Sequence, residues 1–408
     1  MKQFPNCRAC NLQRFWSGVF WIACTSFVAV LSATAAEQIA PSVSIVPAAT
    51  ASINASMRNE VKHAIDKGIT WLVEHQNTNG CWSGPDHPAI TALALIAFQG
   101  HPEKDLKVEE PVVRKGYDFI LSNVKPDGGI YRKDLLGYNS SLCLTALSVA
   151  NRPDFEPVIL KARKFVIGLQ NDTGEPGKID TAMDGGIGYG IKDKEPDLSN
   201  TSWALEALYY SKRFVDDKKL LDAPDLNWKA AIHFIQSCQN LPGYNTEKWA
   251  SDDPQNKGGF IYAPGASKAG ETNLQTGRIA LRSYASMSYA GLLSYIYADL
   301  KPNDPRVTAV MDWLQSNYAI DENPGLGQEG LYYYYHTMAK ALTLAGIDTL
   351  ELKDGRKINW RKDLALKLIN LQHADGAWAN ENGRWFQKDP ALVTPFSLIA
   401  LEMVYRGL

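Results

Sequence analysis

The sequence predicts an all-α protein built as an (α/α)6 toroid, a double ring of six helical hairpins. One pattern recurs along most of the chain: an amphipathic helix, a glycine-rich turn with an aromatic residue, and then a more apolar helix. A repeat of this length decides the fold before any single helix does. The chain has 408 residues, 45% of them apolar, which is enough to bury a sizeable core.

The first helix of each repeat has an apolar face and a charged face. In the first repeat Val61, Ile65, Ile69 and Leu72 recur at the spacing of one helical face. Such helices cover a core on one side and meet water on the other, so they belong in an outer ring. The expected outer helices span residues 60–76, 112–124, 158–170, 228–239, 306–318 and 360–372.

The second helix of each repeat is rich in alanine and leucine and has few charges, which is typical of helices that are covered on all sides. These helices belong in an inner ring and span residues 88–98, 141–150, 201–210, 288–298, 336–346 and 395–404. An open solenoid is the alternative architecture. It would need polar capping repeats at both ends, whereas the terminal repeats here resemble the middle ones.

The turn between the two helices of each repeat contains glycine and an aromatic residue. Glycine allows positive φ and a close approach of the backbone, and the aromatic side chain fills the gap between neighbouring hairpins. The six turns lie at residues 79–82, 128–131, 185–189, 258–262, 330–332 and 375–378.

The N-terminal segment has the features of an export signal. Lys2, Arg8 and Arg14 give it positive charge, residues 15–31 are mostly apolar, and residues 33–36 are small. We therefore expect a signal peptide at 1–36, an Ala/Ser/Pro-rich linker at 37–56 and the toroid at 57–408, in a periplasmic or secreted protein. A retained N-terminal anchor is the alternative. No later segment is long and apolar enough to span a membrane.

Charge and cysteine content narrow the classes of partner. With 42 basic and 44 acidic residues the chain lacks the basic footprint that nucleic-acid binding requires, so we expect no nucleic-acid partner. Signal cleavage would leave Cys81, Cys143 and Cys238, each in a different segment, which is no disulfide framework. No zinc-protease, serine-hydrolase, phosphate-loop or dinucleotide motif occurs in a supporting context.

Two turns carry a more specific signal. The segments from Gln76 to Trp82 and from Gln372 to Trp378 both fit the pattern Q-x-x-x-G-x-W of squalene and oxidosqualene cyclases. With the six hairpins, the chain resembles the terpenoid cyclase and protein prenyltransferase superfamily over residues 59–408, as a single-toroid, exported, squalene-hopene cyclase-like member. The resemblance implies a central aromatic cavity that acts on or binds an isoprenoid or another hydrophobic small molecule.

The acid motif of such cyclases is degenerate here. Their D-x-D-D-T-A segment matches Asp197-Leu198-Ser199-Asn200, and the middle acid, which is the proton donor in that family, is Ser199 in this chain. A serine cannot protonate an alkene. Asp197 or Glu329 would have to act as the acid instead.

The zinc site of the protein prenyltransferases is also incomplete. Their Y-H-T segment matches Tyr335-His336-Thr337, but Arg282 and Tyr284 stand where the other two ligands would be. A catalytic zinc ion needs about three protein ligands. We therefore expect no metal and no cofactor.

Four consecutive tyrosines precede His336 at the start of the fifth inner helix. Helical spacing places Tyr332, Tyr335 and His336 on one face and turns Tyr333 and Tyr334 away. The sequence thus predicts a set of polar and aromatic residues at one mouth of the ring. The candidate catalytic residues are Asp197, Glu329 and His336, and the candidate ligand-binding residues are Tyr138, Asn139, Asn200, Trp203, Arg282, Tyr284, Gln328, Tyr332 and Tyr335.

Three functions fit these observations, and the sequence leaves open whether the protein is an enzyme. The first is an exported cyclase-like protein that acts on or binds an isoprenoid. The second is a non-catalytic periplasmic toroid that binds a ligand or serves as a scaffold. The third is a polysaccharide-active, lyase-like toroid, in which Asn139, His336, Arg282 and Tyr332 would supply the reacting groups.

Overall fold

The computed structural model describes residues 48–102, 110–190, 195–216, 223–274 and 277–408. The predicted signal peptide and most of the predicted linker lie outside these residues. Residues 58–408 form one compact unit. The first helix, α2 (Ala48–Glu74), starts before this unit, so the end of the predicted linker is helical.

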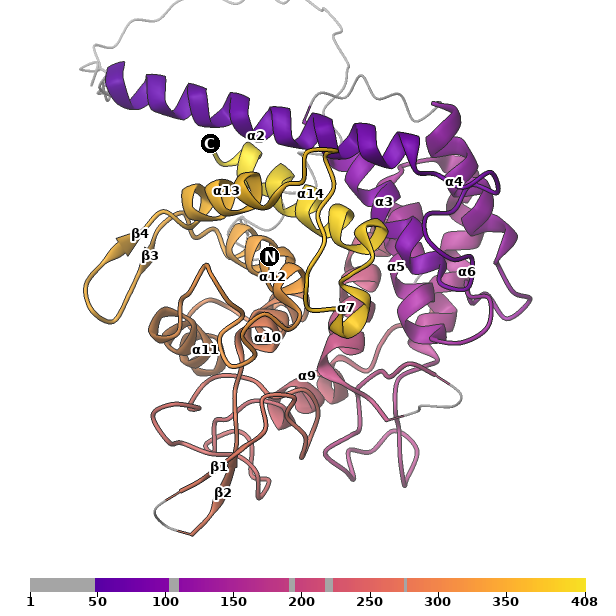
Figure 1. Ribbon diagram of the computed structural model, residues 1–408. Coiled ribbons are helices and arrows are strands. Elements are labelled where there is room, and N and C mark those ends of the chain that lie inside the picture. The colour runs from indigo at the N-terminus through magenta and orange to yellow at the C-terminus, as the bar shows by residue number, and fades with distance from the viewer. Residues whose placement is uncertain (1–47, 103–109, 191–194, 217–222, 275–276) are drawn as a thin grey trace, which may run out of the picture. The chain divides into compact units, whose positions relative to one another are not determined.

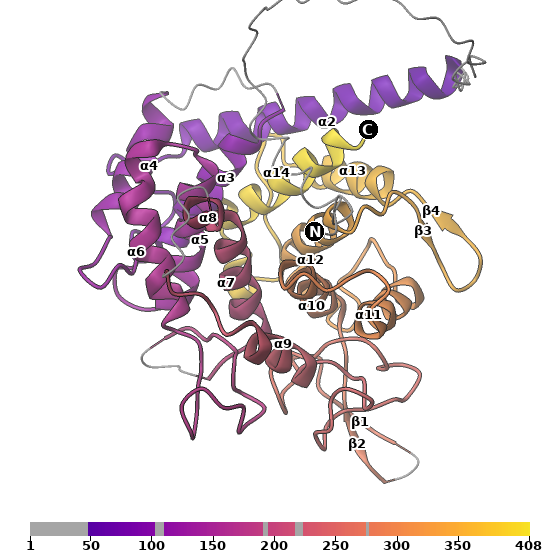
Figure 2. The same ribbon diagram turned by 180° about the vertical axis from the view of Figure 1, so that it is seen from behind.

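Twelve of the described helices pair into the six predicted hairpins, and the all-α double ring is confirmed (Figures 1 and 2). The outer helices are α2, α4 (Pro111–Ser122), α6 (Glu156–Ile167), α9 (Trp228–Ser237), α11 (Pro305–Ser316) and α13 (Trp360–Leu371). The inner helices are α3 (Pro88–Gly100), α5 (Leu136–Val149), α7 (Leu198–Ser211), α10 (Ala285–Tyr297), α12 (Leu331–Leu344) and α14 (Pro390–Arg406).

The inner helices form a closed ring. Each packs on the next in the order α3, α5, α7, α10, α12 and α14, and α14 packs back on α3. This closure distinguishes a toroid from an open solenoid, in which the first and last repeats do not meet. The inner helices are buried on nearly all sides, as their apolar composition predicts.

The repeat turns hold each hairpin against the next outer helix. Gly80 has φ 88° and Gly376 has φ 102°, and a Cβ atom at either would overlap the backbone of the following repeat's outer helix, at Lys115 and Lys67 respectively. Only glycine both accepts a positive φ and lacks the Cβ atom that would overlap the neighbouring backbone. Because Lys67 belongs to the first repeat, the contact of Gly376 also closes the ring.

Glutamine side chains link the repeats in the same way. Gln76 Nε2 donates to the Gly80 carbonyl oxygen at 2.9 Å and to the Val112 carbonyl oxygen of the next repeat at 2.8 Å. Gln372 Nε2 donates to the Gly376 carbonyl oxygen at 2.9 Å and to that of Ala64, in the first repeat, at 2.9 Å. The end of the chain is thereby tied to its beginning.

The structure also contains short elements outside the twelve ring helices, which were not predicted from the sequence. They are the hairpins β1 (Glu271–Asn273) with β2 (Ile279–Leu281) and β3 (Leu350–Glu351) with β4 (Lys357–Ile358), the helix α8 (Arg213–Asp216), and the 3-10 turns η1 (Pro153–Phe155) and η2 (Arg384–Phe386). Within the described residues no helix has the length and apolar character needed to cross a bilayer.

Candidate ligand cavity

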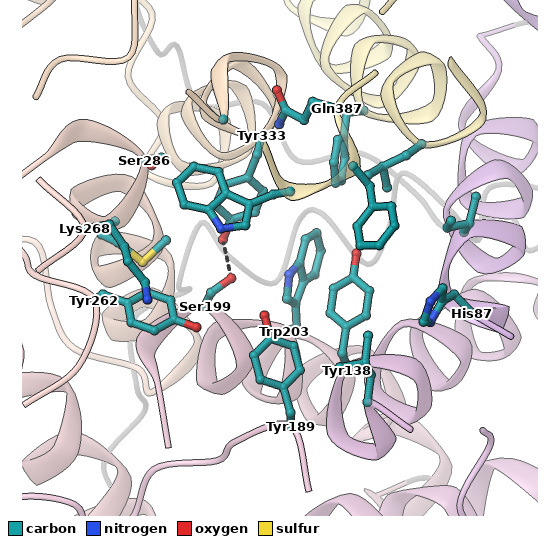
Figure 3. A pocket seen from close by; sticks show the side chains of 18 of the residues that line it. His87, Tyr138, Tyr189, Ser199, Trp203, Tyr262, Lys268, Ser286, Tyr333 and Gln387 are labelled. Carbon is teal, nitrogen blue, oxygen red and sulfur yellow. Dashed lines mark hydrogen bonds between the residues drawn. The ribbon is translucent and has the colours of Figure 1, made fainter. Parts of the chain in front are cut away.

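A cavity of about 550 Å³ opens where the inner helices begin (Figure 3). All six inner helices, or the loops that lead into them, contribute to its lining. This volume lies within the range of small-molecule sites. The lining residues are His87, Ile90, Leu135, Tyr138, Tyr189, Ser199, Trp203, Tyr262, Lys268, Tyr284, Ser286, Met287, Gly330, Tyr333, Gly383, Trp385, Phe386, Gln387, Leu392 and Phe396.

Aromatic rings dominate this lining, and Trp203 of α7 lies at their centre. Its indole is stacked with Phe396 of α14 at 6.5 Å, lies edge to face with Tyr138 of α5 at 6.4 Å, and lies 6.1 Å from the ring of Tyr333. Rings from three other inner helices, α5, α12 and α14, therefore surround the indole of α7. Such a surface suits an apolar or cationic ligand.

The tyrosine run is oriented differently from the prediction. Tyr333 lines the cavity, and its hydroxyl lies 3.2 Å from Ser199 Oγ. Tyr332 and Tyr335 are buried away from the cavity lining, and the Tyr335 hydroxyl donates to the Ile320 carbonyl oxygen at 2.7 Å. Helical spacing groups Tyr332, Tyr335 and His336 on one face, but spacing alone does not say which face of α12 points to the cavity.

His336 lies beside the deep end of the cavity and does not line it. Its ring is 5.4 Å from that of Trp203 and 5.1 Å from that of Phe396, and the residue is 1% exposed. Burial, together with the nearby charge of Lys340, holds the pKa of His336 well below its usual value. The imidazole is therefore neutral at physiological pH.

A buried ion pair includes Lys340, which follows His336 by one helical turn on α12. Lys340 Nζ is 2.7 Å from Glu206 Oε1, and both side chains are 4% exposed. The same ammonium lies 5.3 Å from the ring of Trp203. A buried pair of this kind is costly to break, at about 3–5 kcal/mol for the loss of one partner.

Asp197 caps α7 from behind the cavity wall. Its Oδ1 accepts the Asn200 amide N–H at 2.8 Å, its Oδ2 accepts from Asn200 Nδ2 at 2.6 Å, and the Tyr262 hydroxyl also bonds to it. Burial raises the pKa of Asp197 to about 6, although these hydrogen bonds oppose the shift. Neither Asp197 nor Asn200 is part of the lining, whereas Ser199 between them is.

Four other predicted residues lie outside the lining, for separate reasons. Asn139 is buried, and its Oδ1 accepts the Ala89 amide N–H at 3.1 Å, which joins two inner helices. Arg282 and Gln328 are exposed. Glu329 forms an ion pair with Arg384 at 2.8 Å. None of these four side chains is part of the described cavity lining.

Of the predicted ligand-binding residues, Tyr138, Trp203 and Tyr284 line the cavity. The lyase-like set of Asn139, His336, Arg282 and Tyr332 is not brought together there, since none of the four is in the lining. Within the described residues, no three His, Cys, Asp or Glu side chains are placed to hold a metal ion.

Sequence reasoning missed the loop at the cavity mouth. Trp385 and Phe386 line the cavity and are 41% and 68% exposed. Both have left-handed backbone, with φ 55° and 61°. The preceding Asn382-Gly383 pair is a turn signal, and two aromatic residues directly after a turn could have marked this loop as a ligand contact.

Comparisons with known proteins agree with this architecture. No protein-family model matches the chain. The chain is 26% identical over 176 residues to a lanosterol synthase of Aspergillus fumigatus, a match that spans 39% of this chain and 23% of that enzyme. The chain thus covers less than a quarter of the length of this relative.

Two kinds of solved structure share the fold. A type II terpene cyclase, MstE from Scytonema, superposes with a TM-score of 0.50 and 10% identity, over 86% of this chain and 99% of that one. An α-1,6-mannanase from a Salegentibacter species gives 0.56 and 11%, over 85% and 100%. The chain is thus a terpenoid cyclase-like (α/α)6 toroid, and identities this low support the fold alone.

Proposed function

We propose that this protein binds an isoprenoid or a similar long-chain lipid in the aromatic cavity. The composition of the lining is the observation that carries the proposal. Nine of the twenty lining residues named above are Tyr, Trp or Phe, and none of the described lining residues is Asp or Glu. Burial of an apolar chain against such rings is favourable at about 25 cal/mol per Å² of apolar surface.

The same residues favour binding over acid-catalysed cyclisation. Ser199 stands in the cavity at the position of the proton donor in the resembling cyclases, and its hydroxyl is no acid. Asp197 accepts hydrogen bonds on both oxygens and lies behind Tyr262. These hydrogen-bond donors stabilise the ionised form of the carboxyl group, which opposes donation of a proton to a ligand.

A test for turnover of isoprenoids distinguishes ligand binding from acid-catalysed cyclisation. We expect squalene, oxidosqualene and geranylgeraniol to be recovered unchanged after incubation with the protein, while each quenches the fluorescence of Trp203 and Trp385. A cyclic product from any of them, abolished in Asp197→Asn, would replace the binding function with a cyclase.

Polysaccharide binding is the second candidate, since the fold is shared with a mannanase. Glycoside hydrolysis generally uses two carboxyl groups on either side of the scissile bond, roughly 5–10 Å apart. The described cavity lining offers no such pair. Release of reducing ends from α-1,6-mannan would favour this candidate, and its absence together with lipid binding would exclude it.

We also propose that the chain is exported, on the strength of the charged, apolar and small-residue segments at 1–36. N-terminal sequencing of the protein from its own host should find a mature chain that begins after residues 33–36. An intact Met1 would contradict export by cleavage.

A further inference from the structure

Lys268 gives the cavity a positive charge at its mouth. It is the one Lys or Arg among the described lining residues. The residue as a whole is exposed, but its ammonium lies 4.2 Å from the centroid of the Tyr262 ring. No ion pair of Lys268 occurs with any described residue. Its charge is therefore available to a ligand.

Hydroxyl groups continue from this lysine into the cavity (Figure 3). Ser199 and Tyr333 share one hydrogen bond at 3.2 Å, which uses one of their two hydroxyl protons and leaves the other to donate elsewhere. Burial raises the pKa of Tyr333 far above neutrality, so its hydroxyl keeps its proton. Figure 3 shows Lys268, Tyr262, Ser199 and Tyr333 on one side of the cavity and His87 and Tyr138 across from them.

Apolar side chains make up much of the rest of the lining. Ile90, Leu135, Leu392 and Phe396 come from the first, second and sixth repeats, whereas Lys268, Tyr262 and Tyr333 come from the fourth and fifth. The cavity thus has a cationic and hydroxyl-rich wall from the fourth and fifth repeats, whereas the first, second and sixth repeats contribute apolar side chains beside His87, Tyr138 and Gln387. A neutral hydrocarbon would leave the polar wall without partners, which costs free energy.

We propose that the ligand is an anionic amphiphile, with a carboxylate or phosphate head at Lys268 and the Ser199–Tyr333 hydroxyls and its chain against Trp203 and Phe396. This inference rests on the proposed lipid-binding function and specifies its ligand class. A charge-assisted hydrogen bond from an ammonium to an anion is about twice as strong as a neutral one.

Ligands that share one chain and differ in the head test this directly. Farnesol, farnesoic acid and farnesyl monophosphate would be titrated calorimetrically into the wild type below their aggregation concentrations. We expect at least one of the two anions to bind about five- to tenfold more tightly than farnesol, an increment discounted for the exposure of Lys268. Tighter binding of the acid identifies a carboxylate head, and tighter binding of the monophosphate identifies a phosphate head.

Substitutions of Lys268 test whether its charge causes the preference for anionic ligands. Lys268→Gln should bring the anions to within about twofold of farnesol and leave farnesol unchanged, whereas Lys268→Arg should keep the preference. The matched control is Lys257→Gln, which alters an exposed lysine outside the lining. Equal affinity of the wild type for all three ligands would overturn the inference and leave the lipid-binding function standing. No saturable binding of any ligand would remove both.

Discussion

The carboxyl group of Asp197 is a buried acid at the start of α7, and its protonation is coupled to folding. Its pKa is raised from 3.8 to about 6, chiefly because burial penalises the charged form. A group whose pKa is higher in the folded state than in the unfolded state contributes its full stabilisation at pH values below its unfolded-state pKa. This stabilisation is lost as the pH rises through the folded value. The relevant window is therefore pH 4 to 6.

Asp197→Asn tests this coupling. Asparagine also caps helices, so the start of α7 should be preserved. Relative to the wild type, the variant should gain about 3 kcal/mol of unfolding free energy between pH 4 and pH 8, as an upper bound from the pKa shift. Urea denaturation at both pH values measures this change. An equal difference between the two proteins at pH 4 and pH 8 would show that Asp197 does not titrate with a raised pKa.

The tyrosine run shows where residue-level prediction stops. The sequence places four tyrosines and His336 on the fifth inner helix, and the structure agrees. It could not say that Tyr333 rather than Tyr332 faces the cavity, because α12 is buried on nearly every side and its apolar pattern therefore marks no single face. Rotation of a buried helix is set by its neighbours in three dimensions.

At the scale of elements, the loop from Asn380 to Asp389 places two residues with strained backbone at the cavity. Trp385 and Phe386 both adopt the left-handed conformation that side chains disfavour. The loop is braced at its base, where the Asn380 amide N–H donates to the Gln387 carbonyl oxygen at 2.7 Å and the Asn380 Nδ2 donates to Gln387 Oε1 at 3.0 Å. The bracing keeps two strained aromatic residues at the mouth, which is typical of ligand contacts.

Phe386→Gly separates strain from binding. Glycine accepts the left-handed backbone, so the variant should be about 1 kcal/mol more stable than Phe386→Ala, which removes the same ring but keeps the strain. Both variants should bind farnesol several-fold more weakly than the wild type, because both lose an aromatic contact. Urea denaturation and calorimetric titration measure the two effects. Equal stability of the glycine and alanine variants would contradict the account of strain.

The helices of the ring could be predicted from the sequence, whereas the loops at the cavity could not. Outer and inner helices follow from periodicity and composition, which are local properties of the sequence. The loops at 263–270 and 379–389 supply Lys268, Trp385 and Phe386 to the cavity, and the positions of these loops depend on contacts between distant segments. Tyr262 belongs to a predicted repeat turn, but its place beside Lys268 came only with the fold.

At the scale of the whole molecule, ring closure rests on the contacts between the sixth and first repeats. Gln372 reaches Ala64, Gly376 lies against Lys67, and α14 packs on α3. The corresponding link inside the ring is Gln76, which reaches Val112. The two glutamines have equivalent partners and are both partly exposed, so they form a matched pair.

Gln372→Ala should therefore cost as much stability as Gln76→Ala. Each variant leaves two carbonyl groups without their donor, and we expect a loss of about 1–3 kcal/mol in each case. Urea denaturation followed by both tryptophan fluorescence and circular dichroism measures the loss and shows whether unfolding stays a single transition. In an open array only the internal link would matter, so a neutral Gln372→Ala beside a destabilising Gln76→Ala would contradict closure.

The functional account is less accessible from sequence than the fold. The Q-x-x-x-G-x-W turns and six hairpins led to a cyclase-like toroid, which the fold comparisons confirm. The altered motif at 197–200 left open whether the protein is an enzyme. Only the folded chain shows that Ser199 lines the cavity and that Asp197 caps α7 behind it.

Calorimetric titration of farnesol into the wild type and into Ser199→Trp shows whether a lipid binds in this cavity. An indole at position 199 would project into the cavity beside Tyr333 and take up part of the volume open to a lipid chain. We expect saturable binding of one farnesol per wild-type chain and markedly weaker binding by the variant, whose helical circular dichroism should be unchanged. Equal binding by both proteins, or no saturable binding by the wild type, would contradict a lipid site in this cavity.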